Sequence, residues 1–92
     1  YLQVVNDPSS SRVIMLKNNF VIGRNPGSSL RLGDNTTSRQ HAILTQNKGA
    51  WYIQDMGSAG GTFVNGQRVQ SAALQNGDQV KIGQATFVFR RQ

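Results

Sequence analysis

Short apolar segments that alternate with polar residues, separated every few positions by turn residues, leave this chain few ways to fold. Residues 50–55 place Trp51 and Ile53 on one face and Tyr52 and Gln54 on the other, which is the two-residue period of a half-buried β-strand. No stretch has apolar residues at the i, i+3, i+4, i+7 spacing over two turns, so no helix is predicted. The pattern therefore predicts an all-β sandwich or barrel.

About ten segments of the chain have this strand character. They are residues 1–5, 12–17, 20–22, 30–32, 40–46, 50–55, 62–64, 67–70, 79–82 and 85–90. The dipeptide Asn65-Gly66 between two of them is typical of a two-residue hairpin. Residues 6–11 are predicted to form a turn, and residues 71–78 a longer connection in which Leu74 points inward.

The length and composition indicate one domain. A chain of 92 residues, 37% of them hydrophobic, is enough for a single modest core. Because the chain begins at Tyr1 rather than at a methionine, we expect residues 1–92 to be one domain of a longer protein. The chain has no cysteine, which excludes disulfides and thiolate sites and agrees with a cytoplasmic location. No apolar run approaches the ~18 residues of a membrane span, so no membrane insertion is expected.

The net charge of +6 favours an anionic partner without identifying it. The basic residues are scattered along the chain, whereas a nucleic-acid binder more often clusters them on one face or tail. Trp51 and Tyr52 are adjacent aromatic residues of the kind that stack on bases, but they face opposite ways on a strand, which favours a structural role. We therefore expect no nucleic acid among the partners, and the competing interpretation, a basic barrel that binds any polyanion, predicts a steep salt dependence.

Catalytic and metal-binding patterns are weak. His41 is the single histidine and follows Ser38 by three residues, but a serine nucleophile needs a base held by an acid, and no neighbouring pattern marks such an acid. Four aspartates and one histidine show no spacing typical of metal ligands. We therefore predict a protein that is not an enzyme and that uses no metal and no cofactor.

Anion binding fits the stretch from Gly23 to His41 better. Gly23-Arg24 leaves an apolar strand, and Ser38-Arg39 leads into the next one. The guanidinium fork of arginine suits phosphate oxygens, and the preceding glycine lets the backbone bend out of the strand. A serine hydroxyl and neighbouring backbone N–H groups can donate to the same anion. The residues alone leave open whether Arg24 is only a solvated charge and Ser38 only a turn residue.

Three motifs of this chain occur together in a pattern that resembles a forkhead-associated (FHA) domain. They are Gly23-Arg24, Ser38-x-x-His41 and the sequence GTFVNG at 61–66, and the resemblance covers essentially the whole chain. It implies an all-β fold of the FHA/SMAD type, a two-sheet antiparallel sandwich of about eleven short strands with the binding loops at one end. It also implies a phosphothreonine-dependent interaction module in signalling, which binds phosphopeptides of partner proteins and is monomeric as an isolated domain.

The resemblance also assigns the site residue by residue. Phosphopeptide binding falls on Arg24, Ser38, Arg39, Ala59 and Gly60. Support of the site falls on Gly23, His41, Gly61 and Thr62. Within this scheme Arg24 and Ser38 contact the phosphate, and Arg39 adds a backbone or side-chain contact. His41 takes a position that braces loops and does not touch the ligand.

The loop before residues 62–64 departs from the family pattern. Relatives usually carry Ser/Thr-Asn-Gly-Thr there, whereas this chain reads Ser58-Ala59-Gly60-Gly61-Thr62. Gly60 has no amide to hydrogen-bond the backbone of a peptide, a loss of about 1–3 kcal/mol, or roughly one to two decades of affinity. An alternative therefore stays open: an FHA-like scaffold that binds an unphosphorylated partner or its own chain, with phosphopeptide binding weakened or lost.

Overall fold

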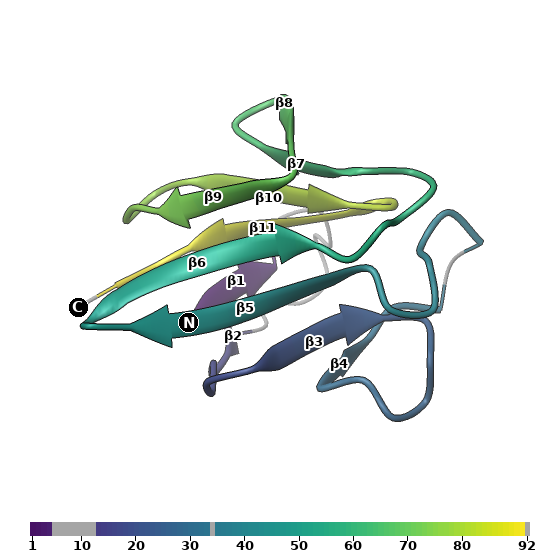
Figure 1. Ribbon diagram of the computed structural model, residues 1–92, viewed down its shortest axis with the longest axis horizontal. Helices are drawn as coiled ribbons and strands as arrows, with labels where there is room; N and C mark the ends of the chain where they lie inside the picture. Colours follow the sequence, from purple (N-terminus) through teal and green to yellow (C-terminus); the bar gives the residue numbers. More distant parts are fainter. Residues whose placement is uncertain (5–12, 34, 92) are drawn as a thin grey trace.

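The structure, a computed structural model, describes residues 1–4, 13–33 and 35–91. This part of the chain forms strands and no helix, and the strands pack as two facing sheets (Figure 1). The strands are β1 (Leu2–Val4), β2 (Val13–Ile14), β3 (Phe20–Gly23), β4 (Leu30–Arg31), β5 (Ala42–Asn47), β6 (Ala50–Asp55), β7 (Thr62–Val64), β8 (Gln67–Val69), β9 (Ser71–Leu74), β10 (Gln79–Ile82) and β11 (Ala85–Phe89). The predicted two-sheet sandwich of about eleven short strands is thereby confirmed.

One pair of neighbouring strands, β3 and β4, is parallel, whereas the other strand pairs of the described residues are antiparallel. The sheets have the orders β2-β1-β11-β10-β7-β8 and β4-β3-β5-β6-β9. In the second sheet β4 runs parallel to β3, with Leu30 opposite Ile22 and Arg31 opposite Gly23. Parallel neighbours normally need a crossover of a dozen or more residues, but here β4 has only two residues and the loop 24–29 makes the return. Both strands consequently end at the same end of the sandwich.

The predicted connection at residues 71–78 is wrong in its first half, which is strand β9. The segment Ser-Ala-Ala-Leu carries little intrinsic strand propensity. It becomes a strand because it pairs with the edge of β6, from Ser71 opposite Gln54 to Leu74 opposite Trp51. Leu74 does point inward, as predicted, and is 4% exposed.

Several strand boundaries also differ from the prediction. The segment predicted as 12–17 keeps only Val13–Ile14 as a strand, and β5 begins at Ala42 rather than at residue 40. The turn predicted at 6–11, and residues 5 and 12 of the neighbouring predicted strands, lie outside the described residues.

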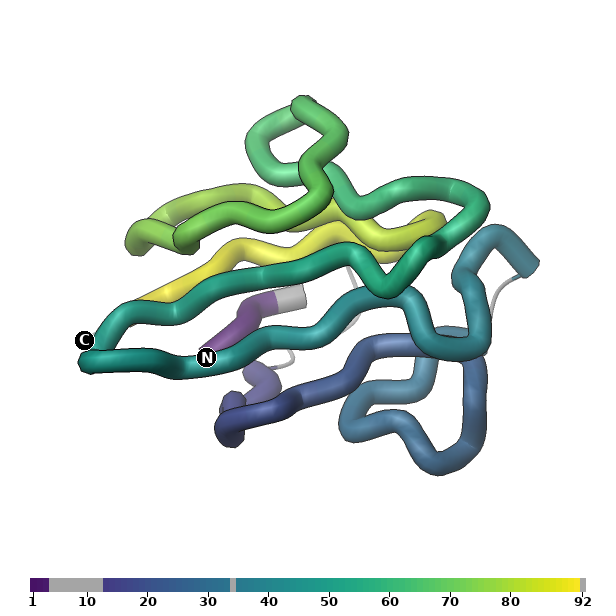
Figure 2. The backbone as a smooth tube through the Cα atoms, in the orientation of Figure 1, coloured from purple at the N-terminus to yellow at the C-terminus, as the bar shows by residue number. Residues whose placement is uncertain are grey.

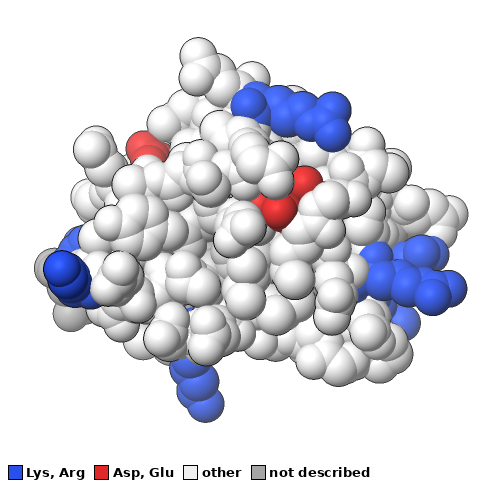
Figure 3. Space-filling view, in the orientation of Figure 1, with Lys and Arg blue, Asp and Glu red and all other residues white. Residues whose placement is uncertain are grey.

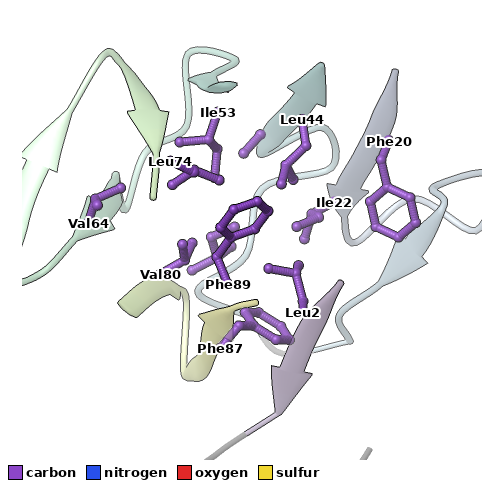
Figure 4. Packing of buried hydrophobic residues seen from close by; sticks show 12 residues of the cluster. Leu2, Phe20, Ile22, Leu44, Ile53, Val64, Leu74, Val80, Phe87 and Phe89 are labelled. Atoms are coloured by element: carbon purple, nitrogen blue, oxygen red, sulfur yellow. The ribbon is translucent and has the colours of Figure 1, made fainter. Parts of the chain in front are cut away.

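The core lies between the two sheets (Figure 4). Alternate residues of Gln79–Ile82 and Ala85–Phe89 point inward, so that Phe87 and Phe89 share one buried face, as predicted. The six-stranded sheet supplies Leu2, Val64, Val80, Ile82, Phe87 and Phe89, and the five-stranded sheet supplies Phe20, Ile22, Ala42, Leu44, Ile53 and Leu74. This close-packed interior gives the connecting loops a firm base.

Three loops gather at one end of the sandwich (Figure 2). They follow β3, precede β5 and follow β6, and they comprise residues 24–29, 35–41 and 56–61. The N and C marks both lie on the side away from these loops (Figure 1), and the Arg91 side chain bonds the Gly49 carbonyl in the β5–β6 turn at the opposite end. The loop end is thus free of the two ends of the described chain.

Candidate functional site

The loop after β3 lies directly against the segment that leads into β5. The Arg24 N–H donates to the Ser38 carbonyl at 2.9 Å, and the Asn25 N–H donates to the Arg39 carbonyl at 3.1 Å. These two backbone bonds set the Gly-Arg motif beside the Ser-Arg motif. The structure therefore brings together residues that the sequence separates by a long polar stretch.

Gly23 makes this contact possible. A Cβ atom placed on Gly23 would lie 2.1 Å from the Arg39 carbonyl oxygen and 2.9 Å from the Arg39 carbonyl carbon, which is far inside van der Waals contact. The sequence reasoning singled out Gly23 because a strand must bend there. The structure gives a different reason, the close approach of another backbone, since the φ angle of Gly23 is not in the left-handed region.

His41 bridges two of the loops from a fully buried position. Its Nδ1 atom accepts a hydrogen bond from the Ser38 N–H at 3.1 Å, and its Nε2 atom lies 2.7 Å from the Gly61 carbonyl. Because a carbonyl only accepts and a backbone N–H only donates, these partners select the neutral tautomer with the proton on Nε2. Both ring nitrogens are engaged with the backbone, and neither is directed at the Ser38 hydroxyl.

Asp55 organises the third loop, a role that the sequence reasoning missed. Its carboxylate accepts hydrogen bonds from the Gly57 N–H at 3.1 Å, the Ser58 N–H at 3.0 Å, the Ser58 hydroxyl at 2.5 Å and the Thr62 hydroxyl at 2.8 Å. The Ser58 hydroxyl in turn accepts from the Gly61 N–H at 3.0 Å. An aspartate at a strand end with Gly-Ser two residues later is an Asx-turn signal, and it was available in the sequence as Asp55-Met56-Gly57-Ser58.

The pKa of Asp55 reflects a balance between two opposing effects. Burial alone raises the pKa of this carboxyl, because it penalises the charged form. The hydroxyl donors of Ser58 and Thr62, together with the backbone N–H groups of Ser58 and Gly57, outweigh burial and lower the pKa below its ordinary value of 3.8. The folded state therefore favours the carboxylate over the acid.

Arg24, Ser38, Ala59 and Gly60 line one hollow of about 400 Å³, together with Asn35, Thr36 and Thr37. The Ser38 hydroxyl oxygen accepts from the Ala59 N–H at 3.2 Å, which leaves its own hydrogen available to a ligand. The Arg24 Nε atom is buried and has no hydrogen-bond partner among the described residues. A buried donor without a partner is costly, and an anion in this hollow would satisfy it.

Arg39 lines a second hollow of about 420 Å³ beside the first, with Arg24, Asn25, Pro26 and Arg31. Figure 3 shows Lys and Arg side chains gathered at the edge of the molecule where these loops lie. Arg24 lines both hollows, whereas Arg39 does not line the first. Arg31, the second residue of β4, was not among the predicted site residues.

The four predicted supporting residues lie beneath these hollows rather than in them. Gly23, His41, Gly61 and Thr62 are all buried. Gly61 has a φ angle of 86°, a conformation that favours glycine, and a Cβ there would lie 2.7 Å from the Arg68 Nε atom. Their part in ligand binding stays a prediction.

The aspartates of the described residues are committed to loop structure. Besides Asp55, Asp78 accepts hydrogen bonds from the Asn65 side chain at 3.0 Å and from the Gln75 N–H at 2.8 Å. Within residues 1–4, 13–33 and 35–91, no group of three or more His, Cys, Asp or Glu side chains could hold a metal ion.

We expect Gly23→Ala to lower the free energy of unfolding by about 1–3 kcal/mol, because the added methyl group collides with a backbone carbonyl that cannot rotate away. Gly27→Ala is the matched control in the neighbouring loop, since a Cβ at Gly27 meets nothing within 4 Å. It should change stability by less than about 0.5 kcal/mol. Chemical denaturation measures both, and equal stability of the two variants would contradict the close-approach argument.

Asp55→Asn should lower the stability at neutral pH by about 1–3 kcal/mol, because one amide cannot accept all the bonds that the carboxylate accepts. The pH dependence has a definite sign. A carboxyl whose pKa is lowered on folding stabilises the fold above its ordinary pKa of 3.8, and this stabilisation is lost as the pH falls further toward the folded value. Unfolding free energies measured across this acidic range should decline more steeply for the wild type than for Asp55→Asn, and identical slopes would refute the assignment.

Comparison with known proteins supports the resemblance. The FHA domain family profile matches residues 20–83. The glycogen accumulation regulator GarA of Mycolicibacterium smegmatis is 41% identical over 81 residues, which cover 88% of this chain and 51% of that protein. The oxoglutarate dehydrogenase inhibitor of Corynebacterium jeikeium is 37% identical over 81 residues, which cover 88% of this chain and 56% of that protein. The chain spans about half the length of these curated relatives.

Solved structures give the same result. A structure from a study of phosphothreonine-dependent FHA domain interactions has a TM-score of 0.89 at 30% identity, covering 99% of this chain and 94% of its own. Mycobacterium tuberculosis EmbR in complex with a low-affinity phosphopeptide has a TM-score of 0.85 at 25% identity, covering 97% of this chain and 24% of its own. With the profile match, the identities and the shared sandwich all in agreement, this chain belongs to the FHA domain family.

Proposed function

We propose that the loop end binds a phosphothreonine-containing segment of a partner protein, with the phosphate in the hollow between Arg24 and Ser38. The observation that carries this proposal is the buried Nε of Arg24, which has no hydrogen-bond partner among the described residues and lies in a hollow that Ser38 also lines. A dianionic phosphate would accept from both groups through charge-assisted hydrogen bonds. The solved complex of the structurally similar EmbR with a phosphopeptide supports the same ligand class.

The remaining predicted residues divide into two groups by their position. Arg39 assists from the adjacent hollow, and Ala59 and Gly60 line the side along which the peptide lies. His41 and Thr62 hold the loops from below through the Gly61 carbonyl and the Asp55 carboxylate. Truncation of the buried residues would therefore alter binding through loop position rather than through loss of a ligand contact.

The site is suited to binding rather than catalysis. A serine nucleophile needs a base within hydrogen-bond reach of its hydroxyl, but the His41 ring faces the Ser38 backbone N–H and the Gly61 carbonyl. Two relatives of this chain are a regulator and an inhibitor by name. Within this proposal the chain is one binding domain of a longer cytoplasmic protein, and it is monomeric by itself. None of the described residues forms a helix able to cross a bilayer.

Arg24→Ala should weaken binding to phosphothreonine peptides by at least about tenfold, because it removes charge-assisted bonds that no other residue of the first hollow can replace. Fluorescence anisotropy with peptide libraries of fixed phosphothreonine, phosphoserine or unmodified threonine measures this loss. Lys48→Ala, in the turn at the far end of the sandwich, is the control and should bind as the wild type does. Equal binding of all three libraries by the wild type would favour the FHA-like scaffold that needs no phosphate.

Gly60 offers a second test, because it stands where FHA relatives usually carry asparagine. A Cβ at Gly60 would lie 3.1 Å from the Thr36 carbonyl oxygen, a tight contact with an exposed loop. Gly60→Ala adds only that contact, whereas Gly60→Asn adds the contact and an amide. We expect Gly60→Asn to bind phosphothreonine peptides about tenfold more tightly than Gly60→Ala, since one peptide hydrogen bond is worth about 1 kcal/mol or more. Indistinguishable affinities would show that the missing amide is not what limits binding.

A further inference from the structure

We propose that Arg31, together with Arg24 and Arg39, forms a second anion subsite beside the phosphothreonine pocket, and that the domain selects phosphopeptides with a second negatively charged side chain near the phosphothreonine. This inference rests on the proposed function and deepens it by naming the substrate class. The second group is a carboxylate or another phosphate on the same peptide.

The parallel pairing of β4 with β3 places Arg31 at the site. Arg31 lies opposite Gly23, which is the residue that precedes Arg24 in the chain. The Leu32 N–H donates to the Gly23 carbonyl at 2.9 Å. In an antiparallel pairing, β4 would run in the opposite direction, away from the loop end. The parallel arrangement instead makes Arg31 a neighbour of Arg24 at the loop end of the sandwich.

The side chain of Arg31 is oriented by the backbone of Arg24. Its Nε donates to the Arg24 carbonyl at 3.1 Å, and within residues 1–4, 13–33 and 35–91 its terminal nitrogens have no acceptor, so they can donate to a ligand. The backbone of Arg39 is fixed as well, because its carbonyl accepts from the Asn25 N–H. The Arg31 guanidinium is thus anchored by a contact that needs no ligand, which limits the entropy lost when an anion binds.

The described residues that line this second hollow carry positive charge only. Three arginines line about 420 Å³ of space with Asn25 and Pro26, and no carboxylate of the described residues is among them. Like charges held close together repel one another, and an anion between them relieves that repulsion.

The two hollows are positioned for one ligand. Arg24 lines both, so an anion in the second hollow lies next to a phosphate in the first and within reach of a nearby residue of the same peptide. The other end of the sandwich carries separate basic residues, Lys48 in the β5–β6 turn and Arg91, whose side chain bonds the Gly49 carbonyl. Figure 3 shows Lys and Arg side chains at both ends and also at the top and bottom of the view, so in this view they form no continuous basic face, which suits a short doubly charged segment better than a flat anionic surface.

The test uses peptide pools with a fixed phosphothreonine and neutral degenerate flanks, in which one flanking position at a time is set to Asp, phosphoserine or Lys. We expect the wild type to bind the best acidic pool about fivefold more tightly than the neutral pool. Arg31→Gln should reduce this preference to within about twofold while keeping its binding to the neutral pool. Lys81→Gln, an equal loss of charge on the exposed face of β10, should keep the preference. Arg31→Lys should retain part of it, because the charge remains but the fork is lost.

The outcomes separate the two proposals. Phosphothreonine-dependent binding that ignores flanking charge, or an acidic preference that survives in Arg31→Gln, overturns the subsite and leaves the proposed function standing. No phosphothreonine-dependent binding by any pool, with no effect of Arg24→Ala, overturns both. Binding of the wild type to phosphatidylserine vesicles that Arg31→Gln abolishes, without an acidic preference among peptides, assigns the arginines to a membrane instead. An acidic preference that weakens as NaCl is raised supports an exposed charged subsite.

Discussion

The contact between Gly23 and the Arg39 carbonyl is the constraint on which the loop end depends. Because no side chain stands between them, the end of β3 and the segment before β5 come into backbone contact, and the bond from Arg24 to Ser38 follows. A guanidinium and a hydroxyl can then face one hollow. The loop end is therefore built first from backbone hydrogen bonds, and these bonds position the side chains that line the hollow.

The third loop is attached to this pair through buried polar groups rather than through apolar packing. Asp55 holds the turn internally, and His41 ties the Ser38 N–H to the Gly61 carbonyl across the gap between loops. Buried polar groups of this kind are stable only when every partner is present, so their networks specify one arrangement. This explains how a segment rich in small, flexible residues can present Ala59 and Gly60 at a defined place.

Most of the fold could be predicted from local signals, whereas pairings decided by tertiary contacts could not. Alternation identified β6, β10 and β11, and Asn65-Gly66 identified the β7–β8 hairpin, in which both turn residues have positive φ angles of 52° and 83°. Strand β9 was missed because its residues become a strand only beside β6. The sequence also contained no sign that β4 would pair parallel to β3. The sequence analysis therefore treated Arg31 as one of many scattered charges.

Gly60 and the three arginines together change the expected basis of recognition. Where an asparagine would grip the peptide backbone through directed hydrogen bonds, this chain has only a glycine close to the Thr36 carbonyl. Near it, Arg24 is shared between a hollow with hydroxyl groups and a hollow lined by two further arginines. Directed backbone bonds hold a peptide regardless of its side chains, whereas charges at fixed positions discriminate by where the ligand carries its anions. Under the two proposals, this loop end selects peptides by the placement of their charges rather than by tightly clamping their main chain.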